Sequence, residues 1–255
     1  MKNFFRRLML FAKLFVSLCN YSNYIDLDYD NVLNQLILIG PNSISITVIT
    51  SFFISLVLAL QIIKEFLYLN VGSLVGSVLA ISFIRELSPV LTSIIVIGKI
   101  GSLFTSEIAT MRITEQIDAL LVLGINPVNY LVLPRLIAII IMLPLLNLFS
   151  LFTGFMSSAF FCFTMYSINP FFFLKSLLYS LFYIDLLKST LKILIFGFFI
   201  ALVSCVWGMT AEGGSKGVGL STTSSVVTSL VLVFIFNFIL SYFMFNDSLS
   251  SFEIL

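Results

Sequence analysis

The sequence predicts an all-α integral membrane protein, with an amphipathic interfacial helix near the N-terminus, five transmembrane helices and a short cytosolic-side helix. Of its 255 residues, 60% are hydrophobic and only 10% are charged, whereas a soluble domain is about 25% charged. Apolar stretches of the roughly 20 residues that a bilayer requires recur along the chain. We find no convincing repeat or linker, so residues 1–255 are expected to form one membrane domain, with residues 40–245 as its transmembrane region.

Residues 2–19 are interpreted as a basic amphipathic helix rather than a cleaved signal peptide, because charges run through the segment and no small-residue cleavage site follows. Its apolar residues recur at spacings of three and four: Phe4, Leu8, Phe11, Phe15 and Leu18. Such a helix suits a membrane interface. A polar, acidic connector follows at residues 20–31, so residues 1–31 form the interfacial region.

The five expected spans are residues 43–63, 73 to at least 100, 136–165, 191–209 and 226–245. A kink is expected at Pro144 in the third span. The Phe-rich segment 171–184 is interpreted as a partly submerged helix. An odd number of spans places the chain ends on opposite sides, and the distribution of basic residues favours the N-terminus inside.

Composition also excludes several functions. A net charge of +1 excludes nucleic-acid binding through bulk positive charge. The chain has no histidine, which excludes histidine-based catalysis and histidine metal sites. The cysteines Cys19, Cys162 and Cys205 are far apart in apolar stretches and are interpreted as small hydrophobic residues. No catalytic residue, metal site or cofactor is therefore expected.

Arg85 and Glu86 are charged residues inside the second apolar stretch. A charge within a span costs about 2.5–3.5 kcal/mol on insertion scales, so such residues usually pair or line a cavity. The alternative places both at a membrane edge, with the helix breaking at Pro89. Lys192, with Asp185 seven residues earlier, is a second candidate polar site, and its alternative is snorkelling to the interface.

The segment between the second and third spans contains a short helix, expected at residues 114–123. Glu115 and Asp118 are placed in its first turn, where the helix dipole favours acids. Gly124 is the expected C-cap and Pro127 bars continuation. One apolar stripe is expected: Ile117, Leu120 and Leu121. The helix is either a docking surface for another subunit or an ordinary interfacial helix.

Glycines and a lysine at residues 212–219 invite comparison with a phosphate-binding loop. Their spacing does not fit G-x-x-x-x-G-K-[ST], and no strand precedes them. We interpret the segment as a tight turn that opens the last span. Any ATP hydrolysis is thus expected on a separate chain, and this chain is not expected to be an enzyme.

Three segments in series resemble MlaE-type permeases, the membrane subunits of ABC lipid transporters. The first runs from RELSPVLTSIIVIGKIGS to NPVNYLVLPR, the second is DLLKSTLKILIFGFFIALVSCVWG, and the third is GGSKGVGLSTTSSVVTSLVLVFIFNFILSYFMF. The likeness as a whole covers roughly residues 40–245. The resemblance implies a homodimeric permease that moves phospholipid, with a separate ATPase subunit and a lipid-binding partner of the MCE type.

Residue roles follow from the same resemblance. Arg85, Glu86 and Lys192 match polar residues of the family's central cavity. Its coupling helix, which docks on the ATPase, is matched by a segment with these candidate residues: Glu115, Gln116, Asp118, Leu120 and Gly124. Two positions depart from the family pattern. Lys99 replaces an arginine and loses its bidentate geometry, and Asn237 stands where an acidic residue is common.

The chain favours Phe, Ile, Asn, Tyr and Lys over Ala, Gly, Pro and Arg, as in proteins from AT-rich genomes. Plastid-encoded algal members of the family fit this pattern, so a plastid (chloroplast) membrane is expected, with a bacterial inner membrane as the alternative. One rival function is a secondary transporter or channel that uses Arg85 and Glu86 as an intramembrane polar site. Another is an intramembrane enzyme, but Glu86 has no acidic partner nearby in sequence.

Overall fold

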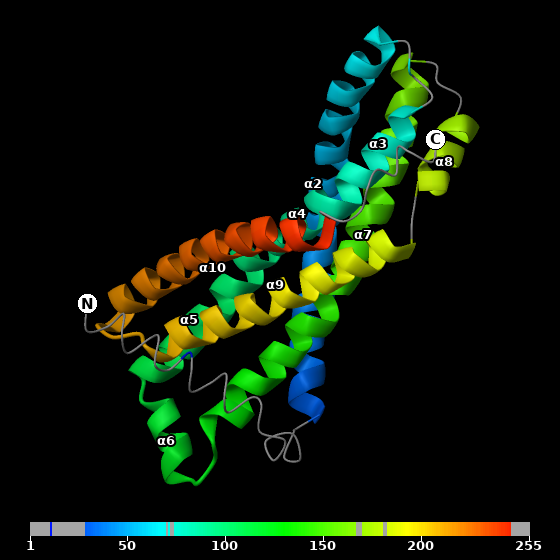
Figure 1. Cartoon of the computed structure of the whole chain (residues 1–255). Helices are drawn as coiled ribbons and strands as arrows, with labels where there is room; N and C mark the ends of the chain where they lie inside the picture. Colours follow the sequence, from blue (N-terminus) through cyan, green and yellow to red (C-terminus); the bar gives the residue numbers. More distant parts are fainter. Residues whose placement is uncertain are drawn as a thin grey trace. The chain divides into compact units, whose positions relative to one another are not determined.

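The structure, a computed structural model, describes residues 11, 29–69, 71, 74–166, 170–180 and 183–245 (Figure 1). All regular elements in this part of the chain are helical. Five helical stretches are long and apolar enough to cross a membrane: Tyr29–Tyr68, Val75–Ile113, Val128–Tyr166, Tyr183–Met209 and Gly214–Met244. The predicted fold class, an all-α multi-pass membrane protein, is confirmed. Apart from Phe11, the predicted interfacial helix lies outside the described residues.

Three of the long helices begin well before the apolar segments that predicted them. They are α2 (Tyr29–Tyr68), α9 (Tyr183–Met209) and α10 (Gly214–Phe245). Polar residues flank the apolar segments in these helices, and in α9 and α10 some of their hydroxyls donate to carbonyls within the helix. In α10, for example, Ser221 donates to the Val218 carbonyl at 3.0 Å and Thr222 to the Gly219 carbonyl at 2.8 Å. The predicted start of the last span at residue 226 is therefore wrong.

The second span is continuous from Val75 to Ile113 and does not break at Pro89. It consists of α3 (Val75–Ser82), the π-helical η3 (Phe83–Leu87), α4 (Ser88–Val96), η4 (Ile97–Gly101, also π-helical) and α5 (Ser102–Ile113). The Ser88 N–H donates to the Phe83 carbonyl, which is the five-residue spacing of a π-helix. The wider turn accommodates the proline, so the alternative of a broken helix is wrong.

The third span combines the π-helical η5 (Val128–Val132) with α7 (Leu133–Tyr166), which contains Pro144. The short helix α6 (Gln116–Val122) precedes it in the chain. The predicted helix in the Phe-rich segment is confirmed as α8 (Pro170–Ser180).

The chain forms two compact units. Unit 1 comprises residues 1–43, 94–143 and 195–234, and unit 2 comprises residues 44–93, 144–194 and 235–255. Each unit has an apolar core, and the cysteines Cys205 and Cys162 are buried in the cores of units 1 and 2, respectively. Their prediction as small hydrophobic residues is confirmed, while the single membrane domain stays a prediction.

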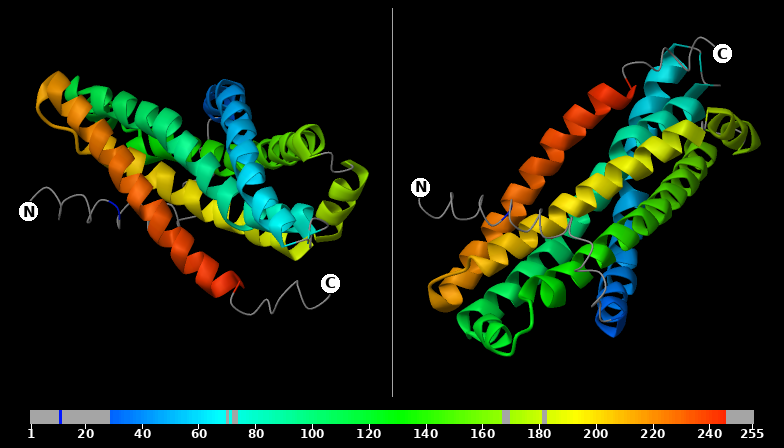
Figure 2. Two further views of the ribbon diagram at one scale, coloured as in Figure 1. Left: turned by 90° about the horizontal axis from the view of Figure 1, so that it is seen from above. Right: turned by 60° about the horizontal axis from the view of Figure 1, so that its bottom comes forward.

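A tight turn joins α9 to α10 in unit 1, as the glycine-rich segment predicts. Gly213 and Gly214 have positive φ angles of 97° and 69°, which glycine adopts without steric cost. Gly217 lies so close to the Glu212 carbonyl that a Cβ atom would clash with it. Figure 2 shows the chain reversing direction at this turn.

Candidate functional site

Four charged side chains of unit 2 form ion pairs between η3 and α9. An Nη2 atom of Arg85 lies 3.0 Å from Asp185 Oδ2, and Lys192 Nζ lies 3.2 Å from Glu86 Oε1. The Lys192 side chain is completely buried, while the Glu86 side chain is 44% exposed. The net charge of the four groups is zero, which lowers the cost of holding them within the spans.

Polar side chains of α10 surround the Glu86 carboxylate. Ser241 Oγ donates to Glu86 Oε1 at 2.7 Å, and Asn237 Nδ2 donates to Glu86 Oε2 at 2.9 Å. Lys192 Nζ also donates to Ser241 Oγ at 2.8 Å. The amide of Asn237 therefore supports a negative charge at Glu86, whereas an acidic residue at this position would bring a second carboxylate beside it.

These pairings join two polar sites that the sequence treated separately. The sequence placed Arg85 beside Glu86 and gave Lys192, with Asp185, as a second candidate, whereas the structure pairs Glu86 with Lys192 and Arg85 with Asp185. Adjacent helical residues point about 100° apart, so Arg85 and Glu86 meet different partners. Lys192 points into unit 2, which favours the polar-site interpretation over snorkelling. Its role in a substrate cavity stays a prediction.

Apart from these four charged residues, which we define as the charge cluster (Arg85, Glu86, Asp185 and Lys192), unit 2 contains a group of buried hydroxyls. Ser88 Oγ donates to Asn147 Oδ1 at 2.6 Å, and Ser51 Oγ lies 2.7 Å from Ser150 Oγ. Sequence reasoning missed this network. Its signal is a run of small polar residues at every fourth position of α2, all of them buried: Ser43, Thr47, Ser51 and Ser55.

Unit 2 also has an apolar groove of about 340 Å³ between α2 and α7. Its walls are almost entirely hydrophobic and include four phenylalanines: Phe52, Phe53, Phe152 and Phe160. A groove of this composition suits a hydrocarbon chain better than a polar solute.

The predicted short helix exists in unit 1 as α6, but it is shorter than expected. Glu115 precedes it in a left-handed conformation, with φ of 60°. A residue in that conformation cannot lie inside a right-handed helix, so the prediction of Glu115 in the first turn is wrong, while Asp118 is there.

The predicted C-terminal cap of α6 is confirmed. Gly124 has a positive φ of 77°. Its N–H donates to the Leu121 carbonyl at 3.1 Å, and the Ile125 N–H donates to the Leu120 carbonyl at 3.0 Å. This pair of bonds is a Schellman motif, which stops the helix at a defined residue.

The apolar residues of α6 divide between two directions. Ile117 is buried in the core of unit 1 and Leu120 packs against that core, whereas Leu121 and Val122 are exposed, Val122 by 88%. The predicted single stripe is therefore split, because the core accommodates only part of it. The rest of the apolar surface of α6 remains uncovered within the part of the chain that the structure describes.

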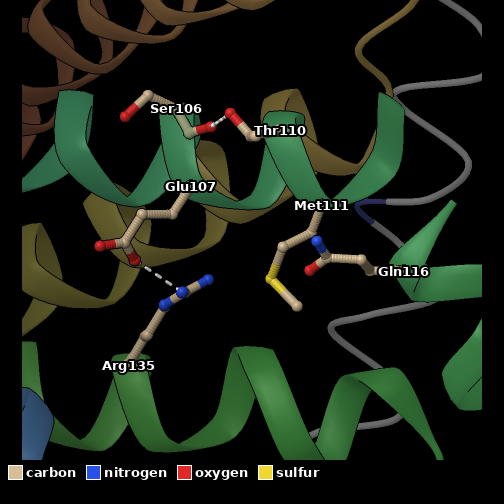
Figure 3. Close-up of a pocket in the computed structure, with 6 residues that line it drawn as sticks. All are labelled: Ser106, Glu107, Thr110, Met111, Gln116 and Arg135. Carbon is tan, nitrogen blue, oxygen red and sulfur yellow. Dashed lines mark hydrogen bonds and ion pairs between the residues drawn. The ribbon is translucent and has the colours of Figure 1, made fainter. Parts of the chain in front are cut away.

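A polar pocket of about 390 Å³ lies between α5, the start of α6 and α7 (Figure 3). Arg135 pairs with Glu107 at 2.7 Å across it, and the Arg135 guanidinium lies 5.2 Å from the ring centre of Phe104. Gln116, a predicted coupling residue, lines the pocket, whereas Asp118 pairs with Arg112 of α5 at 2.6 Å. The sequence did not single out Glu107, because its partner is 28 residues away.

Comparison with known proteins shows what the chain is similar to. The family model described as "Permease MlaE" matches residues 32–243. A probable ABC transporter permease protein, ycf63, of Pyropia yezoensis is 48% identical over 98% of this chain and 94% of its own length. A probable ABC transporter permease protein of Synechocystis is 46% identical over 86% and 83% of the two chains.

A third relative is the Arabidopsis thaliana protein TRIGALACTOSYLDIACYLGLYCEROL 1, described as chloroplastic. It is 43% identical over 86% of this chain and 62% of its own length. The residues matched by the family model include the five spans, the charge cluster and α6. This chain belongs to the MlaE permease family.

Proposed function

We propose that this chain is the permease subunit of an ABC transporter that moves phospholipid or a related lipid between membranes. Its family membership over residues 32–243 carries the proposal. Two relatives are named as probable ABC transporter permeases, and a third is named for a galactose-bearing diacylglycerol lipid. The transporter is proposed to act in a plastid membrane, as the relative described as chloroplastic suggests.

The proposal includes three partners: a second copy of this chain, a separate ATPase and a lipid-binding subunit of the MCE type. The shape of α6 supports ATPase docking. The Schellman motif at Gly124 and the burial of Ile117 fix the helix, while Leu121 and Val122 remain exposed for a partner. Such a rigid, partly apolar projection suits the transmission of movement between subunits.

Arg85 is the proposed contact for the lipid phosphate, since a guanidinium matches phosphate geometry. Its side chain is 18% exposed despite its pairing with Asp185. The apolar groove of unit 2 offers a surface for an acyl chain. The alternative of a secondary transporter or channel is less favoured, because the four charges of the cluster are paired with each other rather than arranged along several spans.

The docking role of α6 is tested by reversing two charges, Glu115→Lys with Asp118→Lys. The complex is purified from its native membrane, and its ATPase content is measured together with the melting temperature of the permease. We expect loss of most of the ATPase with an unchanged melting temperature, because Glu115 and Asp118 are both exposed. Lys216→Glu, an exposed charge reversal at the start of α10, is the matched control.

An intact complex with coupled ATP hydrolysis in the double variant would show that α6 is only an interfacial helix. Cross-linking of a phospholipid probe to the same complexes tests lipid transport separately. If the unaltered complex contains an ATPase but neither it nor the double variant cross-links to the probe, lipid transport is refuted.

A further inference from the structure

Two prolines within the spans occupy the same position relative to a π-helical segment. Pro89 follows the last residue of η3 by two positions, and Pro134 follows the last residue of η5 by two positions. One arrangement lies in unit 2 and the other in unit 1. The repetition of this spacing suggests one structural device used twice.

Each proline removes one backbone donor. In an α-helix the N–H of a residue bonds to the carbonyl four residues earlier, so Pro89 cannot donate to Arg85 and Pro134 cannot donate to Tyr130. Both carbonyls belong to the third residue of their π-helical segment. A carbonyl without a donor is costly inside a membrane, where no water replaces the lost hydrogen bond.

In both cases a side chain from a distant helix donates to that carbonyl. Lys192 Nζ of α9 donates to the Arg85 carbonyl oxygen at 2.8 Å. Asn31 Nδ2 of α2 donates to the Tyr130 carbonyl oxygen at 3.1 Å in an exposed contact, so the cost of a carbonyl without a donor is greater at Arg85 than at Tyr130. Lys192 is completely buried. Its ammonium group, which has three protons, donates to the Arg85 carbonyl, Glu86 and Ser241.

We propose that Lys192 and Asn31 are positioning residues that replace the hydrogen bonds removed by Pro89 and Pro134, and thereby hold the two π-helical segments. In unit 2 this contact fixes the backbone that carries Arg85 and Glu86. Lys192 thus acts on the protein rather than on cargo. The consequence that Arg85 is aimed at a lipid phosphate rests on the proposed function, whereas the backbone role does not.

The test restores the missing donor. Pro89→Ala returns an N–H to position 89 and makes Lys192 dispensable for the Arg85 carbonyl. The parent is Glu86→Gln, so that removal of Lys192 leaves no unpaired carboxylate. Lys192→Met is introduced into this parent, alone and together with Pro89→Ala. Pro144→Ala, which restores an N–H at another proline within a span, is the matched control.

The readout is hydrogen exchange of residues 83–92 in the detergent-solubilised full-length protein, measured by mass spectrometry. A hydrogen bond to a charged group is worth about 1.5–3 kcal/mol, so Lys192→Met should accelerate exchange about tenfold or more. Adding Pro89→Ala should restore the parent rate, and adding Pro144→Ala should not. Pro89→Ala in the parent should change little, because Lys192 already supplies a donor.

No restoration by Pro89→Ala would overturn the proposal, as would equal restoration by Pro144→Ala. Unit 1 offers an independent repeat: Asn31→Leu should accelerate exchange around Tyr130, and Pro134→Ala should reverse it. If Asn31→Leu has no effect, or if Pro134→Ala does not reverse it, the positioning role of Asn31 is overturned and the proposal holds for unit 2 alone.

The second arm measures photocross-linking of a phospholipid probe to the same unit 2 variants. Cross-linking should fall in the Lys192→Met variant and return with Pro89→Ala. Unchanged cross-linking in the Lys192→Met variant, with exchange accelerated and then restored, would refute the role in aiming Arg85 at phosphate while leaving the backbone role intact. Cross-linking that falls and does not return, despite restored exchange, would assign Lys192 to the cargo itself.

Discussion

The charge cluster of unit 2 and the Arg112–Asp118 pair of unit 1 use the same chemistry in different surroundings. Arg112 and Asp118 are separated by 2.6 Å, with side chains 32% and 53% exposed. Arg85 and Asp185 are separated by 3.0 Å, with side chains 18% and 7% exposed. The shorter pair is the more exposed one, so distance alone does not rank their contributions to stability.

Burial decides what each pair does. Water screens an exposed pair and solvates either partner when the other is removed. A buried partner has no such replacement, so breaking a buried pair costs more than its formation contributes. The charge cluster is therefore suited to holding helices in one arrangement. The exposed pair of Arg112 with Asp118 of α6 can break at little cost, so its residues are available for contacts with a partner.

The largest effect is expected for Asp185→Ala, which leaves the Arg85 guanidinium without its carboxylate. Breaking a buried pair typically costs about 3 kcal/mol of unfolding free energy. Unfolding in mixed micelles with increasing sodium dodecyl sulfate measures the loss. The double variant Arg85→Met with Asp185→Leu should recover most of it, and a single-variant loss near zero would contradict the comparison.

An intermediate effect is expected for Asn237→Asp. The change removes the amide that donates to Glu86 Oε2 and places a second carboxylate beside it. Loss of a hydrogen bond to a charged group corresponds to about 2 kcal/mol of unfolding free energy, measured in the same micelles. Glu86→Gln in the Asn237→Asp background should relieve the repulsion. A destabilisation that persists unchanged in this double variant would mean that packing, not charge, is responsible.

The smallest effect is expected for Arg112→Ala. Exposed ion pairs contribute at most about 1 kcal/mol, so the melting temperature should barely change at ordinary salt concentrations. Measurements at low and high salt provide the check, because any contribution of an exposed pair weakens with screening. A salt-independent loss as large as that of Asp185→Ala would show that burial does not separate the two regions.

Local patterns in the sequence predicted the fold class, the five spans, a helix in the Phe-rich segment 171–184, of which the structure has Pro170–Ser180, and the cap at Gly124. These features depend on hydrophobicity and on residues within one turn of each other. The starts of α2, α9 and α10 were misplaced, because the prediction followed the apolar segments alone, whereas these helices continue through the polar residues that flank them. Glu115 was misplaced because glycine is the residue usually expected at a positive φ angle.

Arg85, Glu86 and Lys192 could be identified from the sequence, because a charge within an apolar segment depends only on residue type and position. Their partners became apparent only from the packing of the helices: Arg85 pairs with Asp185, Glu86 pairs with Lys192, and Lys192 also donates to the Arg85 carbonyl. These contacts join residues about a hundred positions apart. They depend on how packed helices are rotated and aligned relative to each other. Side chains throughout a unit determine that arrangement, so the local periodicity of the sequence does not predict it.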